Sequence, residues 1–293
     1  MGKFDQTIGF MLLAVIMNTY LTGIIMSQFF SYWSSSHKDP RWIRCLVAFL
    51  FIINATQACA VVYLSWFYCV TNFTNPQIVG TDLWPYPFTA LTTAVLATTN
   101  QMFQSWRIYK LTRNKIFVAF LVAGSLAACG MGIAGAIGMF LHVHGPAKLV
   151  ALRPIVEGKL LLLCCVDVII AVHLSLIFSR SKTSFARTDR VLNVLIRNAV
   201  QSGSFTAIFA LGTVLSFRLS SDTSMLVLFS LPIGRIYTHT MMDQLVSREE
   251  LTAILQRTTS SMASNSNQTS GEQSNGCTYA GRLHQLRPVP FFA

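Results

Sequence analysis

Seven long apolar segments, separated by shorter polar stretches, form the main pattern along this chain of 293 residues. A helix needs about 20 apolar residues to cross the core of a bilayer, because no water is present there to satisfy exposed backbone groups. Each segment is long enough, so we predict an all-α fold, a polytopic bundle of seven transmembrane helices. The predicted helices span about residues 7–30, 45–69, 86–109, 116–141, 154–178, 196–217 and 223–246.

The composition supports a membrane protein. Hydrophobic residues make up 53% of the chain and charged residues 11%, whereas roughly 25% of the residues in an ordinary soluble domain are charged. So few charges cannot cover the surface of a soluble globule, and this class is excluded. The first apolar segment is too long for a signal peptide and no A-x-A cleavage site follows it, so we interpret it as an anchor.

Lysine and arginine are distributed unevenly among the connections. Most of them lie after the first, third and fifth segments and in the carboxyl-terminal tail. Because basic residues near membrane ends stay cytoplasmic, we predict that the amino terminus lies outside and the carboxyl terminus in the cytoplasm. The net charge of +11 follows from this asymmetry, so anionic lipids of the inner face are expected partners and nucleic acid is not. We expect the protein in the plasma membrane or the endoplasmic reticulum, because the lengths of its crossings do not separate these two membranes.

The pattern changes after residue 246, where the predicted membrane domain (1–246) ends. Residues 247–293 are rich in Ser, Thr, Asn, Gln and Gly, and we predict a disordered cytoplasmic tail because they offer little apolar surface to bury. Asn72 begins an Asn-Phe-Thr acceptor in a connection predicted to lie outside, so we predict a glycoprotein modified at Asn72. Most cysteines lie within apolar segments as small packing residues, and no Cys/His spacing indicates a metal site.

Two charged residues lie near the middle of predicted crossings, Asp167 in the fifth and Arg235 in the seventh. An ionisable side chain at this depth costs at least about 2.5 to 3.5 kcal/mol, so each needs a partner or a use. We predict that they form an ion pair inside the bundle. His173 and His239 lie further toward the cytoplasm on the same two helices, where we expect a second polar layer.

Uncharged polar residues lie at similar depth in the first three crossings, and we expect them to surround a polar cavity among helices two, three, five, six and seven. The alternative is that they only hold neighbouring helices together through hydrogen bonds. These residues are Asn18, Asn54, Gln57, Asn100, Gln101 and Gln104.

Proline and glycine in the seventh predicted helix and small residues in the fourth bear on helix shape and packing. Pro232 and Gly234 are predicted to interrupt or kink the seventh helix beside Arg235. The fourth helix is a ribbon of small residues that includes Gly130 and Gly132, and such a ribbon indicates close helix packing.

The chain lacks the residues that define several classes of membrane protein. The seventh segment has no lysine for a retinal Schiff base, and the chain has no paired aspartate motif for a magnesium-dependent prenyltransferase. The motifs that end the third helix and lie within the seventh helix of animal-type heptahelical receptors are also missing. We expect no cofactor and no metal.

Two sequences in the second half carry a resemblance. The stretch at 188–203 reads TDRVLNVLIRNAVQSG and the stretch at 231–238 reads LPIGRIYT. With them, about residues 7–250 resemble a large basidiomycete family of seven-helix membrane proteins of unknown function. That family usually has Asn at the place of His239 and ends in L-N-x-R, where this chain has Leu245-Val246-Ser247-Arg248. The resemblance implies a fungal source and the seven-helix topology, and it implies no activity.

The sequence favours a receptor-like or sensor-like membrane protein that binds a lipophilic small molecule and uses Asp167 and Arg235 as a switch. One alternative is a membrane-embedded enzyme of isoprenoid or other secondary metabolism, in which Asp167 protonates an apolar substrate. A close arginine would oppose that role, because it favours the ionised carboxylate. A small-solute transporter is the other alternative, supported by the polar layer.

Overall fold

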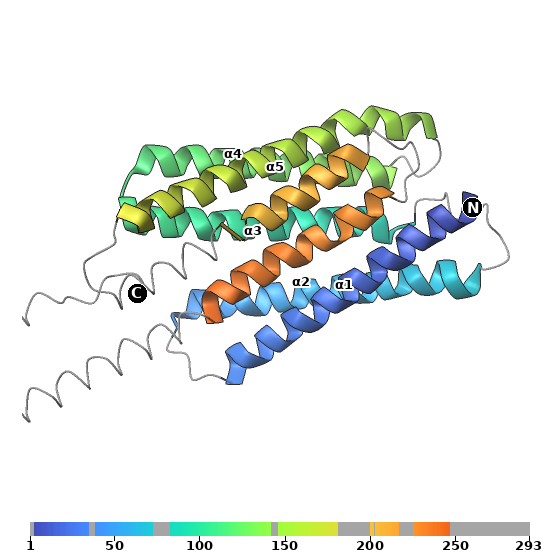
Figure 1. Cartoon of the computed structure of the whole chain (residues 1–293), viewed down its shortest axis with the longest axis horizontal. Coiled ribbons are helices and arrows are strands. Elements are labelled where there is room, and N and C mark those ends of the chain that lie inside the picture. The colour runs from blue at the N-terminus through green and yellow to red at the C-terminus, as the bar shows by residue number, and fades with distance from the viewer. Residues whose placement is uncertain are drawn as a thin grey trace, which may run out of the picture.

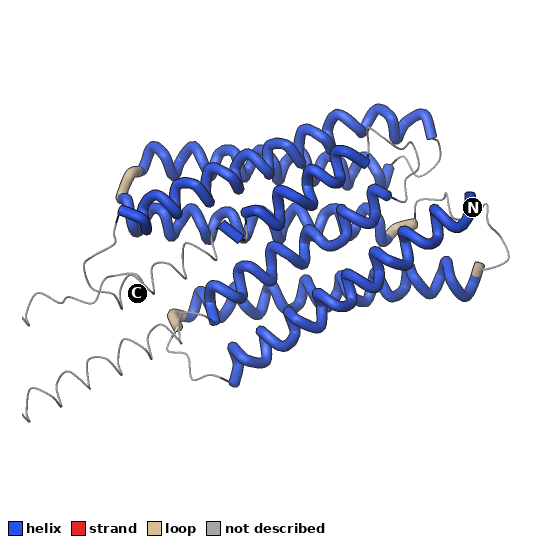
Figure 2. The backbone as a smooth tube through the Cα atoms, viewed as in Figure 1, coloured by secondary structure: helices blue, strands red, loops and turns tan. Residues whose placement is uncertain are grey.

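The computed structural model describes residues 3–34, 39–72, 83–141, 146–180, 200–201, 203–216 and 225–246. The predicted tail at 247–293 lies outside the described residues. Within the described ranges the chain is all-helical, with seven α-helices and no strand, and a two-residue loop at 113–114 joins two of the helices (Figure 2). The all-α prediction is therefore confirmed.

Each predicted apolar segment lies on one of these helices. They are α1 (Lys3–Ser34), α2 (Arg41–Trp66), α3 (Pro85–Thr112), α4 (Lys115–Leu141), α5 (Pro146–Arg180), a helix at Gly203–Ser216 and a last helix at 225–246, which we call the final helix. A short π-helix η1 (Phe67–Thr71) continues α2.

Four of the helices are long and apolar enough to cross a membrane. These spans are Gly9–Ser34, Arg41–Thr71, Lys115–Leu141 and Pro154–Ile177. Large apolar side chains face outward along them, with Ile16 56% exposed and Phe120 63% exposed. Polar side chains such as Asn54 and Gln101 are buried instead. This arrangement, apolar outside and polar inside, is that of a helical protein embedded in a membrane.

The connection between α3 and α4 shows how local sequence ends one helix and begins the next. Arg113 adopts a left-handed conformation (φ 53°), and its N–H donates to the carbonyl of Tyr109 at 2.9 Å. The Oδ1 atom of Asn114 then accepts from the N–H groups of Ile116 and Phe117 at 3.2 and 3.4 Å. These two caps turn the chain within two residues, so α3 and α4 pack as antiparallel neighbours.

The helices form two groups with the final helix between them (Figure 1). On one side α3, α4 and α5 pack together, on the other side α1 packs on α2, and α2 also contacts α3 directly. Close contact of α4 with α3 depends on Gly132, because a Cβ atom there would lie 2.7 Å from the Cβ of Ala94. Gly130 on the exposed face has nothing within 4 Å of such an atom. Only part of the predicted small-residue ribbon therefore makes close helix contacts.

The final helix is buried along most of its length. The prediction that Pro232 and Gly234 interrupt it is wrong, because helical structure continues through both residues, and the kink stays a prediction. Gly234 serves close packing instead. A Cβ atom there would lie 3.0 Å from Oγ1 of Thr93 on α3 and 3.6 Å from Nε2 of Gln57 on α2.

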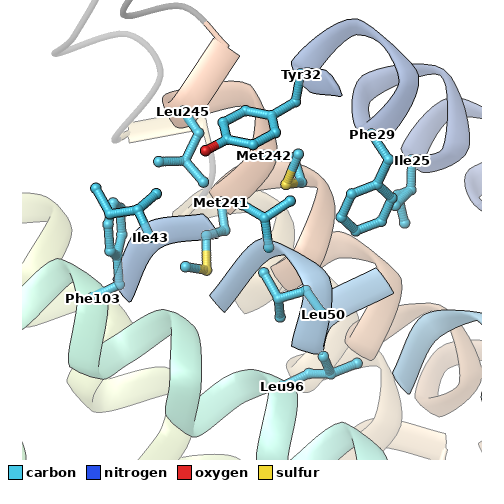
Figure 3. Close-up of a cluster of buried hydrophobic side chains, with 11 residues drawn as sticks. Ile25, Phe29, Tyr32, Ile43, Leu50, Leu96, Phe103, Met241, Met242 and Leu245 are labelled. Atoms are coloured by element: carbon cyan, nitrogen blue, oxygen red, sulfur yellow. The ribbon is translucent and has the colours of Figure 1, made fainter. Parts of the chain in front are cut away.

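An apolar cluster joins the end of the final helix to α1, α2 and α3 (Figure 3). Side chains from all four helices point into it. They are Ile25, Phe29, Tyr32, Ile43, Val47, Leu50, Leu96, Phe103, Met241, Met242 and Leu245. A second apolar cluster contains Ala14, Val61, Val227 and Leu231, from α1, α2 and the start of the final helix. Arg235 lies between these two clusters along the final helix.

Candidate functional site

Arg235 is completely buried and makes hydrogen bonds to both helices of one group. Its Nε atom donates to Oδ1 of Asn18 on α1 at 3.2 Å. Its Nη1 atom donates to the carbonyl oxygen and to Oδ1 of Asn54 on α2, at 2.9 and 2.7 Å. We call these three residues the Arg235 network. It ties the final helix to α1 and α2 through charge-assisted hydrogen bonds.

Asn54 is positioned for this role by two further hydrogen bonds. Its Nδ2 atom donates to the carbonyl of Leu50 at 2.8 Å and to Oγ1 of Thr238 at 3.0 Å. The amide is thereby oriented with its oxygen toward Arg235. Thr238 itself donates to the carbonyl of Gly234 at 3.2 Å, so the contact links α2 to the backbone of the final helix.

Asp167 on α5 makes a separate network with the other helix group. The carboxylate is 7% exposed, and its Oδ1 atom accepts from Nε2 of Gln101 on α3 at 2.9 Å. Its Oδ2 atom accepts from the hydroxyl of Tyr237 on the final helix. We call these three residues the Asp167 network. It ties the final helix to α3 and α5, opposite to the Arg235 network.

The ion pair predicted between Asp167 and Arg235 is not formed. Within the described part of the chain, no salt bridge joins the two side chains, and each has its own uncharged partners. The physical reason is the direction of the side chains. Arg235 and Tyr237 are two residues apart, about 200° around the helix at 3.6 residues per turn, so they point to opposite groups of helices.

A small polar space lies beside the Asp167 network. It is lined from four helices by Asn100, Gln104, Asp167, Ile170, Ala171, Leu174, Gly203, Thr206, Tyr237 and Thr240. About 10 Å³ is open to the centre of a water molecule, which is close to the minimum that holds one water. This water-sized space lies among α3, α5, Gly203–Ser216 and the final helix, and the larger cavity predicted among five helices stays a prediction. No residue of α2 lines this space, so Asn54 and Gln57 belong to the Arg235 side.

The two histidines lie apart from both networks. Nδ1 of His239 lies 3.0 Å from Oε1 of Gln28 on α1. The ring of His173 lies against the ring of Phe117 on α4, with 4.1 Å between centroids, and its Nε2 atom has no hydrogen-bond partner among the described residues. Each histidine has a different neighbour, and neither hydrogen-bonds to Asp167 or Arg235.

Several buried polar atoms of the candidate residues have no hydrogen-bond partner among the described residues. They are both amide atoms of Gln57, Oδ1 of Asn100, Oε1 of Gln101 and Gln104, and Nη2 of Arg235. Buried polar atoms are almost always hydrogen-bonded in proteins, so orphaned ones indicate either a cost or a bound partner. Two of them, on Asn100 and Gln104, belong to residues that line the small polar space.

Tyr237 is the candidate-site residue that the sequence did not predict. It stands two residues after Arg235 in the conspicuous stretch at 231–238, but it was assigned no role. Its position on the face opposite Arg235 was the available signal. Thr206 and Thr240, which line the space, carry no such signal because hydroxyl residues are common in apolar helices, where they bond to the backbone.

A larger apolar groove lies on the outer surface between α2, α3 and α4. About 680 Å³ of this groove is open to the centre of a water molecule. Aromatic and apolar side chains dominate its lining, and the indole rings of Trp42 and Trp106 meet edge to face there at 4.8 Å. Its residues are Trp42, Cys45, Leu46, Phe49, Val95, Thr98, Thr99, Met102, Phe103, Trp106 and Cys129.

The predicted glycosylation residue, Asn72, follows η1 and is partly exposed. Its Nδ2 atom, the atom that would carry a glycan, donates to the carbonyl of Phe67 at 3.1 Å. The rest of the acceptor sequence lies outside the described residues. Glycosylation at Asn72 stays a prediction.

Comparison with known proteins found a match for the part of the chain that holds Asp167, Arg235 and Tyr237. Residues 163–250 match the model of a family of unknown function (DUF6534). This segment is similar to that family. The match includes Asp167, Arg235 and Tyr237, and it assigns no activity to them. No curated protein and no solved structure matches the chain. The basidiomycete source implied by the resemblance stays a prediction.

Proposed function

We propose that the chain is a receptor-like or sensor-like membrane protein of seven crossings, with its final helix as the element that moves. Its amino terminus lies outside, its tail is cytoplasmic, and it resides in the plasma membrane or the endoplasmic reticulum. Anionic lipids contact its basic cytoplasmic face. The proposal concerns a protein without catalytic activity.

One observation carries this proposal: the final helix is held by two polar networks on opposite faces. Arg235 bonds to α1 and α2, and Tyr237 bonds to Asp167 beside α3. A displacement of the helix toward one group stretches the bonds to the other. Hydrogen bonds of this kind have two discrete arrangements, made or broken, which is what a two-state switch requires.

The proposed ligand is a lipophilic small molecule that enters from the bilayer. The apolar groove between α2, α3 and α4 has the size of small-molecule sites, which is roughly 300 to 1,000 Å³. The polar space at Asp167 has room for about one water molecule, so we assign the ligand to the groove and the switch to the networks.

The alternatives draw less support from the described residues. An enzyme that uses Asp167 to protonate an isoprenoid needs a substrate-sized space at that carboxylate, and the space there is water-sized. A transporter needs a continuous polar route, and apolar clusters lie on both sides of Arg235. A role in fungal secondary metabolism remains open to both alternatives.

Spin-label distances test the proposal directly. In a chain with its native cysteines replaced by alanine, labels at Val246 and Ser179 report the distance from the final helix to α5. We expect Asp167→Asn, which removes the charge that Tyr237 and Gln101 bind, to add a second, displaced population. Wild type should show one population in the same membrane mimetic.

Two controls make the result specific. Labels at Tyr109 and Ser179 report the α3 to α5 distance, which should not change in Asp167→Asn. The variant Glu157→Gln removes a carboxylate elsewhere on α5 and should match wild type. Identical distance distributions for wild type and Asp167→Asn would contradict the proposal that the Asp167 network holds the final helix in place.

A further inference from the structure

We propose that the polar space beside Asp167 is a binding site for a monovalent cation, Na⁺ in preference to K⁺. The first argument is charge. Asp167 accepts hydrogen bonds from the amide of Gln101 and from the hydroxyls of Tyr237 and Thr206, and within the described part of the chain no lysine, arginine or histidine pairs with it. A buried carboxylate that lacks a cationic partner is costly, and a bound cation removes that cost.

The second argument is the set of oxygen atoms. Oδ1 of Asn100 and Oε1 of Gln104 are buried without a partner among the described residues, in side chains that are 5% and 4% exposed. The two residues are four apart on α3, so they lie one turn apart on the same face. Both line the same space as the Asp167 carboxylate, although other helices supply its remaining walls.

A hydroxyl adds a further oxygen. Thr240 lines the space, and its hydroxyl donates to the carbonyl of Tyr237 at 3.0 Å. Because its hydrogen is used in that bond, the lone pairs of its oxygen remain available to a ligand. The carboxylate of Asp167 has about four lone-pair sites; hydrogen bonds from Gln101, Tyr237 and Thr206 use three of them, and one remains.

The ligand atoms and the volume of the space beside Asp167 indicate which ion it would bind. The donors are oxygen atoms, which hard cations prefer, and the described residues hold no group of three His, Cys, Asp or Glu side chains suited to a transition metal. One carboxylate balances one positive charge. The space is about as small as one water molecule, and a small cavity with a strong carboxylate field favours Na⁺ over the larger K⁺.

Thermal unfolding in different salts tests the site. The purified full-length chain in detergent is heated in NaCl, KCl or choline chloride at one pH and constant ionic strength. A ligand that binds only the folded state raises Tm, by about 3 to 6 °C at ten times its Kd for a chain of this size. We expect this rise, saturable, in NaCl, and a much smaller one in KCl.

Three variants assign the effect to the site. Asp167→Asn should lose the Na⁺ response. Gln104→Met keeps Asp167 and its hydrogen-bond donors but removes one oxygen, so it should need at least about ten times more Na⁺ for half of the rise. Glu157→Gln, a matched carboxylate change outside the space, should respond as wild type does.

Equal Tm values in the three salts would overturn the proposal, and so would a Na⁺ response that persists in Asp167→Asn. If Asp167→Asn does not fold, the half-saturating Na⁺ concentrations of wild type and Gln104→Met are compared instead. An unchanged half-saturating Na⁺ concentration in Gln104→Met would then also overturn it. The site does not require the final helix to move, so this titration and the spin-label measurement fail independently.

Discussion

Arg235 and Asp167 are buried charged residues, and uncharged groups solvate both of them. Amide and carbonyl oxygens of Asn18 and Asn54 surround the guanidinium, and an amide and a phenol bind the carboxylate. Hydrogen bonds to charged groups are worth about 1.5 to 3 kcal/mol each, more than neutral ones. The neutral partners therefore contribute strongly to holding these charges in the interior of the bundle.

Two substitutions on α2 compare a polar side chain that hydrogen-bonds to Arg235 with one that has no hydrogen-bond partner among the described residues. Asn54→Leu removes an acceptor of Arg235 and should lower the free energy of unfolding by about 2 to 3 kcal/mol. Gln57→Leu, one turn away, removes two buried amide atoms that have no partner among the described residues, so stability should be unchanged or higher. Unfolding of both variants by a denaturing detergent measures the difference.

A loss in Gln57→Leu as large as that in Asn54→Leu would contradict this account. It would mean that the Gln57 amide holds a bound molecule, and Nη2 of Arg235, which is also without a partner among the described residues, would be the first atom to examine.

Sequence reasoning located the buried polar residues but not their partners. Depth along a helix follows from counting residues, so Asp167, Arg235, Asn54 and Gln101 could all be placed inside the bundle. The direction in which each side chain points relative to the other helices depends on how the helices are rotated and arranged. That arrangement is set by packing, which single-sequence patterns do not encode, and the predicted ion pair was wrong for this reason.

Among the helices, α4 shows which small residues the packing requires. Gly132 is buried against Ala94 on α3 and Lys159 on α5, where a Cβ atom would lie 2.7 Å from the Cβ of Ala94 and 3.2 Å from the Cε of Lys159. Gly130 lies on the exposed face. Composition predicted that α4 packs closely against other helices. Which of its small residues face those helices depends on how the helices are arranged, and composition does not give that arrangement.

This difference makes a matched prediction. Gly132→Leu should lower the free energy of unfolding by at least about 1 to 3 kcal/mol, the usual cost of overpacking, because the backbones of α3 and α4 must separate. Gly130→Leu places the same side chain toward the lipid and should be close to neutral. Tm values of the two variants in the same detergent check this, and equal losses would show that the α4 contact is misassigned.

Helix positions were the most predictable elements. All seven apolar segments correspond to helices, because the apolar length needed in a bilayer is a strong constraint. The effect of Pro232 was not predictable, since a proline in a long buried helix is tolerated when neighbouring groups pack around it. The caps at Arg113 and Asn114 are local features, and they explain why the boundary between α3 and α4 lay within a few residues of its prediction.

Over the whole molecule, the final helix is the structural centre of the bundle. It lies between α1 with α2 and α3 with α5, and polar networks hold it on both sides (Figure 1). The segment similar to the family of unknown function, 163–250, contains this helix and Asp167 but not α1 to α3. The partners Asn18, Asn54 and Gln101 thus come from outside the matched segment.

The central claim is that the final helix is held by two separate networks, and a pair of double-mutant cycles tests it most directly. The free energy of unfolding is measured for Asp167→Leu, Tyr237→Phe and Arg235→Met, and for each of the two double variants that contain Asp167→Leu. We predict an interaction energy between Asp167 and Tyr237 of at least about 1 kcal/mol, and a clearly smaller one between Asp167 and Arg235. The reverse order, with the Asp167 and Arg235 double variant recovering most of the stability lost in the single variants, would show that these charges act as an ion pair and would contradict the account.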